Sequence, residues 1–431
     1  HKLSNISWTP NQKRIALTKK TETGVELWVL EIENGSVTKL TEPNLNSNIG
    51  SVINWFADSE NMLVKMISNN RKSLIDTNQI VPDGPTISTN FGEKAQNRTY
   101  QDLLKNKFDE HNFEQLSTSA IFKVSIDGSV KKWMDDGMYR TISFSPNGEY
   151  VMISQINKPF SYLVTYSRFP TETNVYSKDG NFISNLLNVP LIEELPKGFM
   201  SVRTGKRSFS WRPDKGASLT YVTALDSGDP SKKVDFRDEV YELNYPFLGQ
   251  GKFILKTINR FSGIDWGTKD MAIAYDTWWN TRNRKSYVFN PSNPNIKPKI
   301  ISDRNYQDTY SDPGVFLRSR NEFNRSVLKM HYGNIFLRGQ GFSPNGQFPF
   351  IDKVNTKTFE KTRVYQSSYT DKIESIIDYD PKKNQLTVSI ESPSEYPNYY
   401  IKKIKSGKLE KITDLKNPFL ELQNVKKKKI T

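Results

Sequence analysis

A short hairpin pattern recurs along the chain and constrains its fold more than any other feature. Each copy consists of an apolar residue, an aromatic residue, a turn with Pro and Asn or Asp, and a β-branched run. Clear copies start at Ile6, Ile142, Phe209 and Ile377, and looser copies start at Ile53 and Ile264. Pro presets φ at the second position of a type I turn, and Asn, Asp or Gly tolerates the next positions. Each copy therefore predicts two strands joined by a tight turn, with one buried face.

The spacing of these hairpins predicts the architecture. The intervals are 47, 89, 67, 55 and 113 residues between the aligned aromatic residues Trp8, Trp55, Phe144, Trp211, Trp266 and Tyr379. The last interval has room for two units, and the strand-like stretches from Ser326 and Pro349 form a degenerate unit inside it. Periods of about 40 to 50 residues with about four short strands are typical of propeller blades. We therefore expect an all-β fold, with residues 1–431 forming one β-propeller of seven blades of about four antiparallel strands.

Residues 76–119 interrupt this rhythm. The segment is polar and begins with turn residues, and from Thr99 it places apolar residues at helical spacing: Tyr100, Leu103, Leu104 and Phe108. The pattern predicts a partly helical insertion in the second blade, which explains the 89-residue interval. Such an insertion is either a helical cap over one rim or a functional lid.

Composition excludes several function classes. The chain carries 61 Lys and Arg against 47 Asp and Glu, a net charge of +14, but the basic residues are spread along it without a nucleic-acid-binding motif. A solvated basic surface is the commoner meaning of such a balance, so we expect no nucleic-acid partner. No apolar run approaches 18 residues and no signal-like segment starts at His1, so no membrane span or visible targeting is expected. The absence of Cys excludes disulfides and thiol chemistry.

The catalytic motifs of hydrolases are missing. No Gly-x-Ser-x-Gly string occurs, and the nearest one, GQGFSPNG from Gly339, has Asn345 in place of the last Gly. That string is better interpreted as a turn, because its glycines precede no helix that could hold a phosphate. The three histidines, His1, His111 and His331, are isolated in sequence, and no metal-binding spacing occurs. We therefore expect no catalytic residue, no metal and no cofactor in this chain.

Several long strings carry a family resemblance. They are VPDGPTISTNFGEKAQNRTYQDLLKNKFDEHNFEQLSTS, INKPFSYLVTYSRFPTETNVYSKDG, SVRTGKRSFSWRPDKGASLTYVTALDSGDP, RFSGIDWGTKDMAIAYDTWWNTR and IESPSEYPNYYIKKIKSGKLEKIT. Together they resemble the glutamyl endopeptidase-like branch of the prolyl oligopeptidase family of serine peptidases, over nearly the whole chain. The resemblance implies an N-terminal β-propeller followed by a C-terminal α/β-hydrolase domain, which holds the catalytic Ser, Asp and His.

The resemblance covers the propeller and not the hydrolase domain. None of the family's catalytic residues has a matching position here, so the chain is expected to be inactive alone. The family's chain leaves the propeller where this sequence reads LQNVKKKKIT, and we interpret residues 424–431 as the start of a linker to an absent hydrolase domain. Family members usually carry a further stretch before the first hairpin, so eight blades are possible in the complete protein.

In this family the propeller limits access to peptides or unfolded segments and supplies part of the substrate pocket. A preference for Glu implies a cationic receptor, for which Arg is apt because its planar fork binds a carboxylate bidentately. The candidates, which lie in the most family-like strings, are Arg168, Arg203, Arg207 and Arg282. The alternative for each is a surface salt bridge or packing on Tyr or Trp. Because neighbouring strand residues face opposite ways, we expect one of Trp278 and Trp279 in the core and the other at a rim or interdomain contact.

Two hypotheses follow. The favoured one is the non-catalytic propeller domain of a glutamyl endopeptidase-like peptidase, whose partners are the hydrolase domain and peptide or unfolded-protein substrates. The alternative is a stand-alone TolB-like propeller that binds a protein or ligand in its own pocket. The resemblance leaves the compartment open, because relatives occur in plastids and, in bacteria, often with export signals; between these we favour export.

Overall fold

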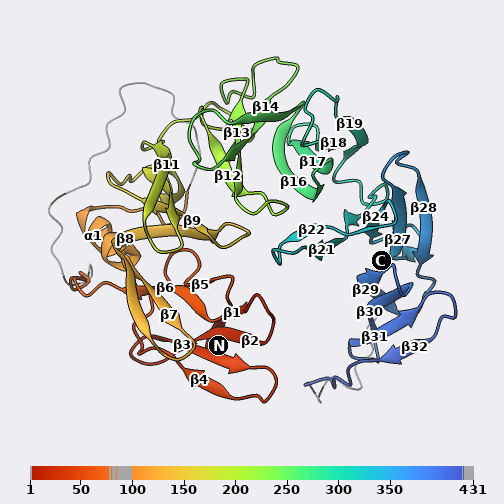
Figure 1. Cartoon of the computed structure of the whole chain (residues 1–431), viewed down its shortest axis with the longest axis horizontal. Helices are drawn as coiled ribbons and strands as arrows, with labels where there is room; N and C mark the ends of the chain where they lie inside the picture. Colours follow the sequence, from red (N-terminus) through yellow and green to blue (C-terminus); the bar gives the residue numbers. More distant parts are fainter. Residues whose placement is uncertain (1, 77–78, 80–83, 85–99, 420, 422–431) are drawn as a thin grey trace. The chain divides into compact units, whose positions relative to one another are not determined.

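The computed structural model describes residues 2–76, 79, 84, 100–419 and 421 of the chain. It divides into two compact units, His1–Asp235 with Glu239–Ile254 (unit 1) and Phe236–Asp238 with Leu255–Thr431 (unit 2). Antiparallel strands dominate both units (Figure 1).

Unit 1 begins with two sheets. The first has the order β1-β2-β3-β4, with β1 (Leu3–Trp8), β2 (Arg14–Lys20), β3 (Val25–Glu31) and β4 (Val37–Lys39). The second has seven strands in the order β11 to β5, with β5 (Ile53–Trp55), β6 (Asn61–Ile67), β7 (Ser119–Ser125), β8 (Val130–Phe144), β9 (Tyr150–Ile156), β10 (Thr171–Ser177) and β11 (Phe182–Val189). The next sheet, whose residues are divided between the units, contains β12 (Arg207–Trp211), β13 (Ser218–Ala224), β14 (Asp238–Asn244) and β15 (Lys252–Thr257).

Unit 2 contains three larger sheets. The first has β16 (Arg260–Thr268), β17 (Met271–Trp278), β18 (Asn283–Phe289) and β19 (Lys299–Asn305). The second has β20 (Val315–Phe316), β24 (Asn334–Gly339), β27 (Phe350–Asn355) and β28 (Lys361–Gln366), and β23 (Met330–His331) pairs with β24. The third has β29 (Ile373–Asp380), β30 (Gln385–Glu391), β31 (Asn398–Lys403) and β32 (Leu409–Lys411). Two small hairpins complete it: β21 (Arg318–Arg320) with β22 (Ser326–Leu328), and β25 (Phe342–Ser343) with β26 (Gly346–Gln347).

These sheets confirm the prediction of an all-β propeller. Within the described part of the chain, five sheets have the four or five mostly sequential strands of a blade. The apolar cores lie between consecutive sheets: Leu27 of β3 packs with Val64 of β6, and Val175 of β10 packs with Tyr221 of β13. Blades of a propeller bury their faces against their neighbours in this way. The count of seven blades stays a prediction.

The insertion expected at 76–119 lies between two paired strands. β6 and β7 pair from Asn61↔Ser125 to Ile67↔Ser119, so the chain between them leaves the sheet and returns to it. Its last part is helix α1 (Lys107–Ser117), whose N-cap Asn106 accepts a hydrogen bond from the Asp109 amide at 2.9 Å. Residues 77–78, 80–83 and 85–99 lie outside the described residues.

The predicted helical spacing from Thr99 is wrong for its first part, because the helix begins only at Lys107. Tyr100 and Leu104 precede it and pack against a cluster that contains Ile156 and Phe169. Their spacing therefore reflects contact with this cluster, and the N-cap residue Asn106 sets the start of the helix.

The turns of the recurring hairpin are built alike. Thr9 donates a hydrogen bond to the Asn11 side chain at 2.8 Å and accepts one from the Arg14 amide at 3.0 Å. In the third copy, Ser145 donates to Asn147 at 2.7 Å and accepts from the Tyr150 amide at 3.0 Å. The turn residues thus satisfy their own backbone, as Asn and Ser do in Asx and ST turns.

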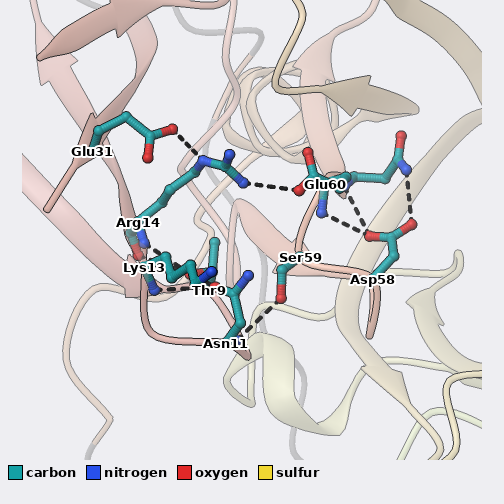
Figure 2. A network of polar contacts seen from close by, with 9 residues as sticks. Thr9, Asn11, Lys13, Arg14, Glu31, Asp58, Ser59 and Glu60 are labelled. Carbon is teal, nitrogen blue, oxygen red and sulfur yellow. Dashed lines mark hydrogen bonds and ion pairs between the residues drawn. The ribbon is translucent and has the colours of Figure 1, made fainter. Parts of the chain in front are cut away.

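Consecutive turns of unit 1 also contact one another. The Asn11 amide donates to the Ser59 hydroxyl at 3.1 Å (Figure 2), and the Asn147 amide donates to the Gly216 carbonyl at 2.9 Å. Gly148, at φ 76°, lies so close to Ala57 that a Cβ on it would approach the Ala57 methyl within 2.9 Å. The hairpin turn is therefore both a local reversal and a contact between neighbouring sheets.

The aligned tryptophans add a second contact of this kind. The Trp55 indole donates to the Ser7 carbonyl at 3.3 Å, and the Trp211 indole donates to the Ser143 carbonyl at 3.0 Å. In each case the acceptor is the residue before the aromatic position of an earlier hairpin, Trp8 or Phe144. The repeated sequence therefore produces a repeated hydrogen bond.

Candidate ligand-binding pocket

The four arginines selected from the sequence lie in different surroundings. Arg168 ends a short 3-10 helix, Tyr166–Arg168, with its guanidinium 5.8 Å from the Tyr100 ring centre. Arg203 and Arg207 lie close together. Burial and the charge of Arg207 lower the pKa of Arg203, and Arg203 donates to the Thr204 carbonyl at 2.9 Å and to the Lys206 carbonyl.

Arg282 belongs to unit 2, at a backbone φ of 54°. It donates to the Trp279 carbonyl at 2.7 Å and stacks on the Trp279 ring at 3.8 Å. Trp278 is partly buried, with Arg237 stacked on its ring at 3.9 Å, and Trp279 is 42% exposed. The expectation that one of the pair lies in the core is therefore wrong, because strand β17 ends here and each ring packs against an arginine instead.

A pocket of about 700 Å³ lies wholly within unit 2. One wall is the sheet β16–β19, and the other comes from β20, β21, β24, β27 and β28 with the second half of β29. Its basic residues are Arg284, Arg304, Arg318, Arg338 and Lys361, and its acidic residues are Asp265, Asp312 and Asp378. The lining therefore carries an excess of positive charge.

A hydrogen-bonded chain spans one side of the pocket. The Tyr275 hydroxyl donates to one oxygen of Asp265 at 2.7 Å, and Arg318 pairs with the other oxygen. Burial and the charge of Asp265 raise the pKa of Tyr275 above its ordinary range. Because only 8% of the Asp265 side chain is exposed, its charge is satisfied inside the protein. Asp265 and Arg318 thus neutralise each other.

Two further arginines lie side by side on strands β18 and β19. Arg284 and Arg304 are direct cross-strand partners, followed on the same face by the partners Ser286 and Ser302. Like charges directly opposite each other destabilise a sheet. The Arg304 side chain is only 12% exposed, and its nearest carboxylate, Asp312, lies 3.9 Å away.

The rest of the pocket lining is mostly apolar. The core cluster around Ile273 and Ile335 continues into the pocket through Ile301, Phe316, Leu337, Val354 and Phe359. The exposed Val315 also lines the pocket. A ligand that fits this pocket therefore needs both an apolar part and an anionic group.

Sequence reasoning did not select the pocket arginines. Arg284 lies two residues after the candidate Arg282, just past the end of its string, but its pairing with Arg304 depends on the register of β18 and β19. That register includes a bulge between Ser286 and Tyr287, which no local pattern indicates.

The described part of the chain contains neither a candidate metal site nor a membrane-spanning helix. In that part of the chain, no group of three or more His, Asp or Glu residues could hold a metal ion. No helix there is long and apolar enough to cross a membrane.

Comparison with known proteins shows which sequences this chain resembles. No family model matches the chain. It is 32% identical over 455 residues to "Probable glutamyl endopeptidase, chloroplastic" of Oryza sativa subsp. japonica, and 30% identical over 455 residues to the protein of the same name from Arabidopsis thaliana. Both alignments cover 100% of this chain. The chain is similar over its whole length to these two glutamyl endopeptidases.

The alignments span 48% of the rice glutamyl endopeptidase and 47% of the Arabidopsis one, so the chain corresponds to about half the length of these relatives. The resemblance to the glutamyl endopeptidase branch of the prolyl oligopeptidase family is thereby confirmed. Both relatives are named as chloroplastic proteins, and export of this chain stays a prediction.

Solved structures with a similar fold include two peptidases and a propeller domain. An acylaminoacyl peptidase in complex with Z-Gly-Gly-Phe-chloromethyl ketone is 12% identical, with a TM-score of 0.41 over 93% of this chain and 50% of that one. A prolyl endopeptidase is 10% identical, with a TM-score of 0.43 over 93% and 46%. The propeller domain of the trilobed protease of Pyrococcus furiosus is 11% identical, with a TM-score of 0.39 over 96% and 99%.

Proposed function

We propose that the chain is the non-catalytic propeller domain of a glutamyl endopeptidase-like serine peptidase. In this role it gates the access of peptides to the active site and contributes to their recognition. The carrying observation is the alignment of the entire chain with only 48% and 47% of two glutamyl endopeptidases. The partner is then a C-terminal α/β-hydrolase domain of the same polypeptide, reached through a linker that starts within residues 424–431, which lie outside the described residues.

The proposal includes seven blades. Its support is β8, whose first part pairs with β7 from Val130 to Gly137 and whose second part pairs with β9 from Met138 to Phe144. We interpret the seven-stranded sheet as two blades of four strands that share β8. Added to the five four- or five-stranded sheets of the described residues, these give seven.

Two parts of the domain are assigned to gating and recognition. The segment 76–119 is proposed as a cap or lid, because it leaves and re-enters the sheet between paired strands. Arg168, Arg203, Arg207 and Arg282 stay candidates for recognition of a Glu side chain. Of these, Arg168 and Arg282 stack on aromatic rings, an arrangement that orients a guanidinium for bidentate binding.

Gating is tested in the complete protein. A fluorogenic peptide with one Glu and the same sequence inside a stable folded domain are compared by kcat/KM. We expect rapid cleavage of the peptide and little of the folded protein, while the 431-residue chain alone cleaves neither. Equal cleavage of both substrates would exclude gating, and hydrolysis by the chain alone would contradict a non-catalytic role.

Recognition is tested with single Arg→Ala variants of the complete protein. If an arginine binds the Glu side chain, its replacement by Ala should lower kcat/KM for Glu peptides and leave kcat/KM for Gln peptides unchanged. A variant with unchanged selectivity removes its residue from the candidates. Arg203→Ala and Arg207→Ala are measured singly and together, because the two side chains are neighbours.

A stand-alone binding propeller is the second candidate function. It is favoured by the pocket of about 700 Å³, whose lining belongs to unit 2 alone and needs no second domain. The gene distinguishes the two. An open frame that continues past Thr431 to a Gly-x-Ser-x-Gly motif, then Asp and His, supports the peptidase. A stop codon there supports the binding protein.

A further inference from the structure

We propose that the pocket of unit 2 binds a carboxylate carried on a short aliphatic stem, such as the side chain of Glu in a peptide. If the proposed function holds, this site contributes to the recognition of acidic peptides. The inference itself depends on the pocket and not on the presence of a hydrolase domain.

The first argument is the charge that the fold leaves over. Arg318 is neutralised by Asp265, and Asp378 pairs with Lys329, which lies outside the lining. In contrast, Arg284 and Lys361 line the pocket without an ion-pair partner among the described residues. These two cations are therefore available to an anionic ligand.

The second argument is the arrangement of Arg284 and Arg304. The two are direct cross-strand partners on one face, where repulsion between them costs stability. An anion between the two guanidinium groups removes that repulsion and accepts charge-assisted hydrogen bonds from both. The hydroxyls of Ser286 and Ser302, the next partners on this face, are further donors.

The third argument concerns the type of anion. Arg304 donates to the Asp308 carbonyl and to Ser311 at 3.5 Å and lies 3.9 Å from Asp312, which limits its freedom to turn away. Beside it, Ile301, Val315 and Phe359 form an apolar wall. A small inorganic anion leaves this wall uncovered, whereas a carboxylate on methylene groups covers it and gains free energy from burial. The pocket therefore matches an organic acid better than phosphate.

The experiment measures binding to the 431-residue chain by isothermal titration calorimetry. The probes are acetyl-Ala-Glu-Ala-amide, its Gln counterpart, glutarate and inorganic phosphate. We expect the Glu peptide to bind at least about tenfold more tightly than the Gln peptide, since only its carboxylate accepts charge-assisted hydrogen bonds from the arginines. Its affinity should fall as salt is raised.

Variants assign the binding to the pocket. Arg284→Gln and Arg304→Gln should each weaken Glu-peptide binding about tenfold or more, and Lys361→Gln should weaken it less, because Lys lacks the planar fork. Arg320→Gln is the matched control: Arg320 is an exposed arginine of β21 in the same unit that does not line the pocket. Because Arg284 is exposed, its variant should fold even if the Arg304 variant does not.

Each outcome decides the proposal. Equal affinity for the Glu and Gln peptides, or Glu-peptide binding that survives Arg284→Gln, overturns it. Phosphate that binds as tightly as the carboxylates also overturns it. Glutarate that binds as well as the Glu peptide supports the site and points to free dicarboxylic acids as the source. If the Glu peptide does not bind the 431-residue chain, the result of the gating assay in the complete protein is unaffected. The two proposals can therefore be contradicted independently.

Discussion

The two units connect neighbouring sheets in different ways. In unit 1 the hairpin motif makes short connections: the Asn11 amide binds Ser59, the Asn147 amide binds Gly216, and the Trp211 indole binds the Ser143 carbonyl. The ion pair of Arg14 with Glu60 accompanies them. In unit 2 they are long cationic side chains. Arg318 reaches Asp265, and Arg338 donates to the carbonyls of Ile376 and Ile377 at 2.9 and 2.6 Å.

The difference follows the sequence repeat. In the second sheet of unit 2, the Pro344-Asn345 turn between β24 and β27 forms only the small separate hairpin β25/β26, and β24, β27 and β28 come from the degenerate stretch that starts at Ser326. In its place, Lys329 and Arg338 donate hydrogen bonds from their side chains to backbone carbonyls of β29. Long side chains span the distance, and the pocket of about 700 Å³ lies among them. Loss of repeat regularity therefore coincides with the candidate binding site.

The largest expected effect concerns a feature that the units share. Glu242 in unit 1 is 2% exposed and pairs with Arg212 at 3.0 Å, and Glu374 in unit 2 is fully buried and pairs with Lys402 at 2.7 Å. Glu242→Gln and Glu374→Gln should each lower the free energy of unfolding by about 3 kcal/mol, because each leaves a cation with too few acceptors. Urea denaturation measures the loss. If only one of the two variants lost little unfolding free energy, the buried ion pairs inside the blades would also differ between the units.

Unit 1 also contains cationic contacts: Arg14 pairs with Glu60 at 3.0 Å, and Lys65 forms a buried contact with the backbone. The Lys65 ammonium group donates to the Ile49 carbonyl, and burial lowers its pKa to about 8. Above that pH the folded protein loses the proton before the unfolded chain does, so stability rises with pH until the unfolded pKa is passed. Relative to Lys65→Met, the wild-type chain should gain about 2 kcal/mol between pH 7 and pH 10.

The measurement is the difference in unfolding free energy between the two proteins at each pH, which cancels the titration of other groups. Lys20→Met is the control, because Lys20 is exposed at the end of β2. Parallel pH profiles for the wild-type chain and Lys65→Met would show that Lys65 keeps its ordinary pKa. In that case burial of the Lys65 ammonium group would be offset by its hydrogen bond to the Ile49 carbonyl.

Much of the fold could be predicted because its signal is local. The hairpin copies from Ile6, Ile53, Ile142, Phe209, Ile264 and Ile377 form the paired strands β1/β2, β5/β6, β8/β9, β12/β13, β16/β17 and β29/β30. Turn residues and alternating apolar residues act within about ten positions, so one sequence is enough to find them.

The parts that escaped prediction depend on distant contacts. Nothing in the sequence of β8 indicates that its halves pair with different strands, because both halves are strand-like. The apolar spacing near Tyr100 reflects packing against Phe169 rather than a helical face. The pocket required Arg284 to meet Arg304, a register that two separate strands set together. Candidate arginines could be selected by residue type, but their neighbours could not.

A smaller effect is expected at the tryptophan contacts of unit 1. Trp211→Phe keeps an aromatic ring against Phe247 but removes the hydrogen bond to the Ser143 carbonyl. The free energy of unfolding should fall by about 1 kcal/mol, the typical net contribution of such a bond. Trp8→Phe is the control, because Trp8 is 52% exposed and starts no contact of this kind to an earlier hairpin. Equal losses in both variants would show that the indole bond contributes nothing.

The smallest effect is expected for Arg318, and its dependence on salt separates the two kinds of contact. The Arg318 side chain is 55% exposed, so solvent screens its pair with Asp265, and Tyr275 still donates to Asp265 when Arg318 is replaced. Arg318→Met should lower the free energy of unfolding by about 0.5 kcal/mol at low salt. In about 1 M salt the Debye length is about 3 Å and the loss should nearly vanish.

The loss in Trp211→Phe should stay the same at both salt concentrations, because a neutral bond to a carbonyl is not screened. Arg320→Met, on the same strand as Arg318, controls for the removal of an exposed arginine. If the loss in Arg318→Met were independent of salt and as large as that in Trp211→Phe, the connections of the two units would be equivalent. The contrast between short backbone contacts and long charged ones would then be a difference of geometry without a difference in energy.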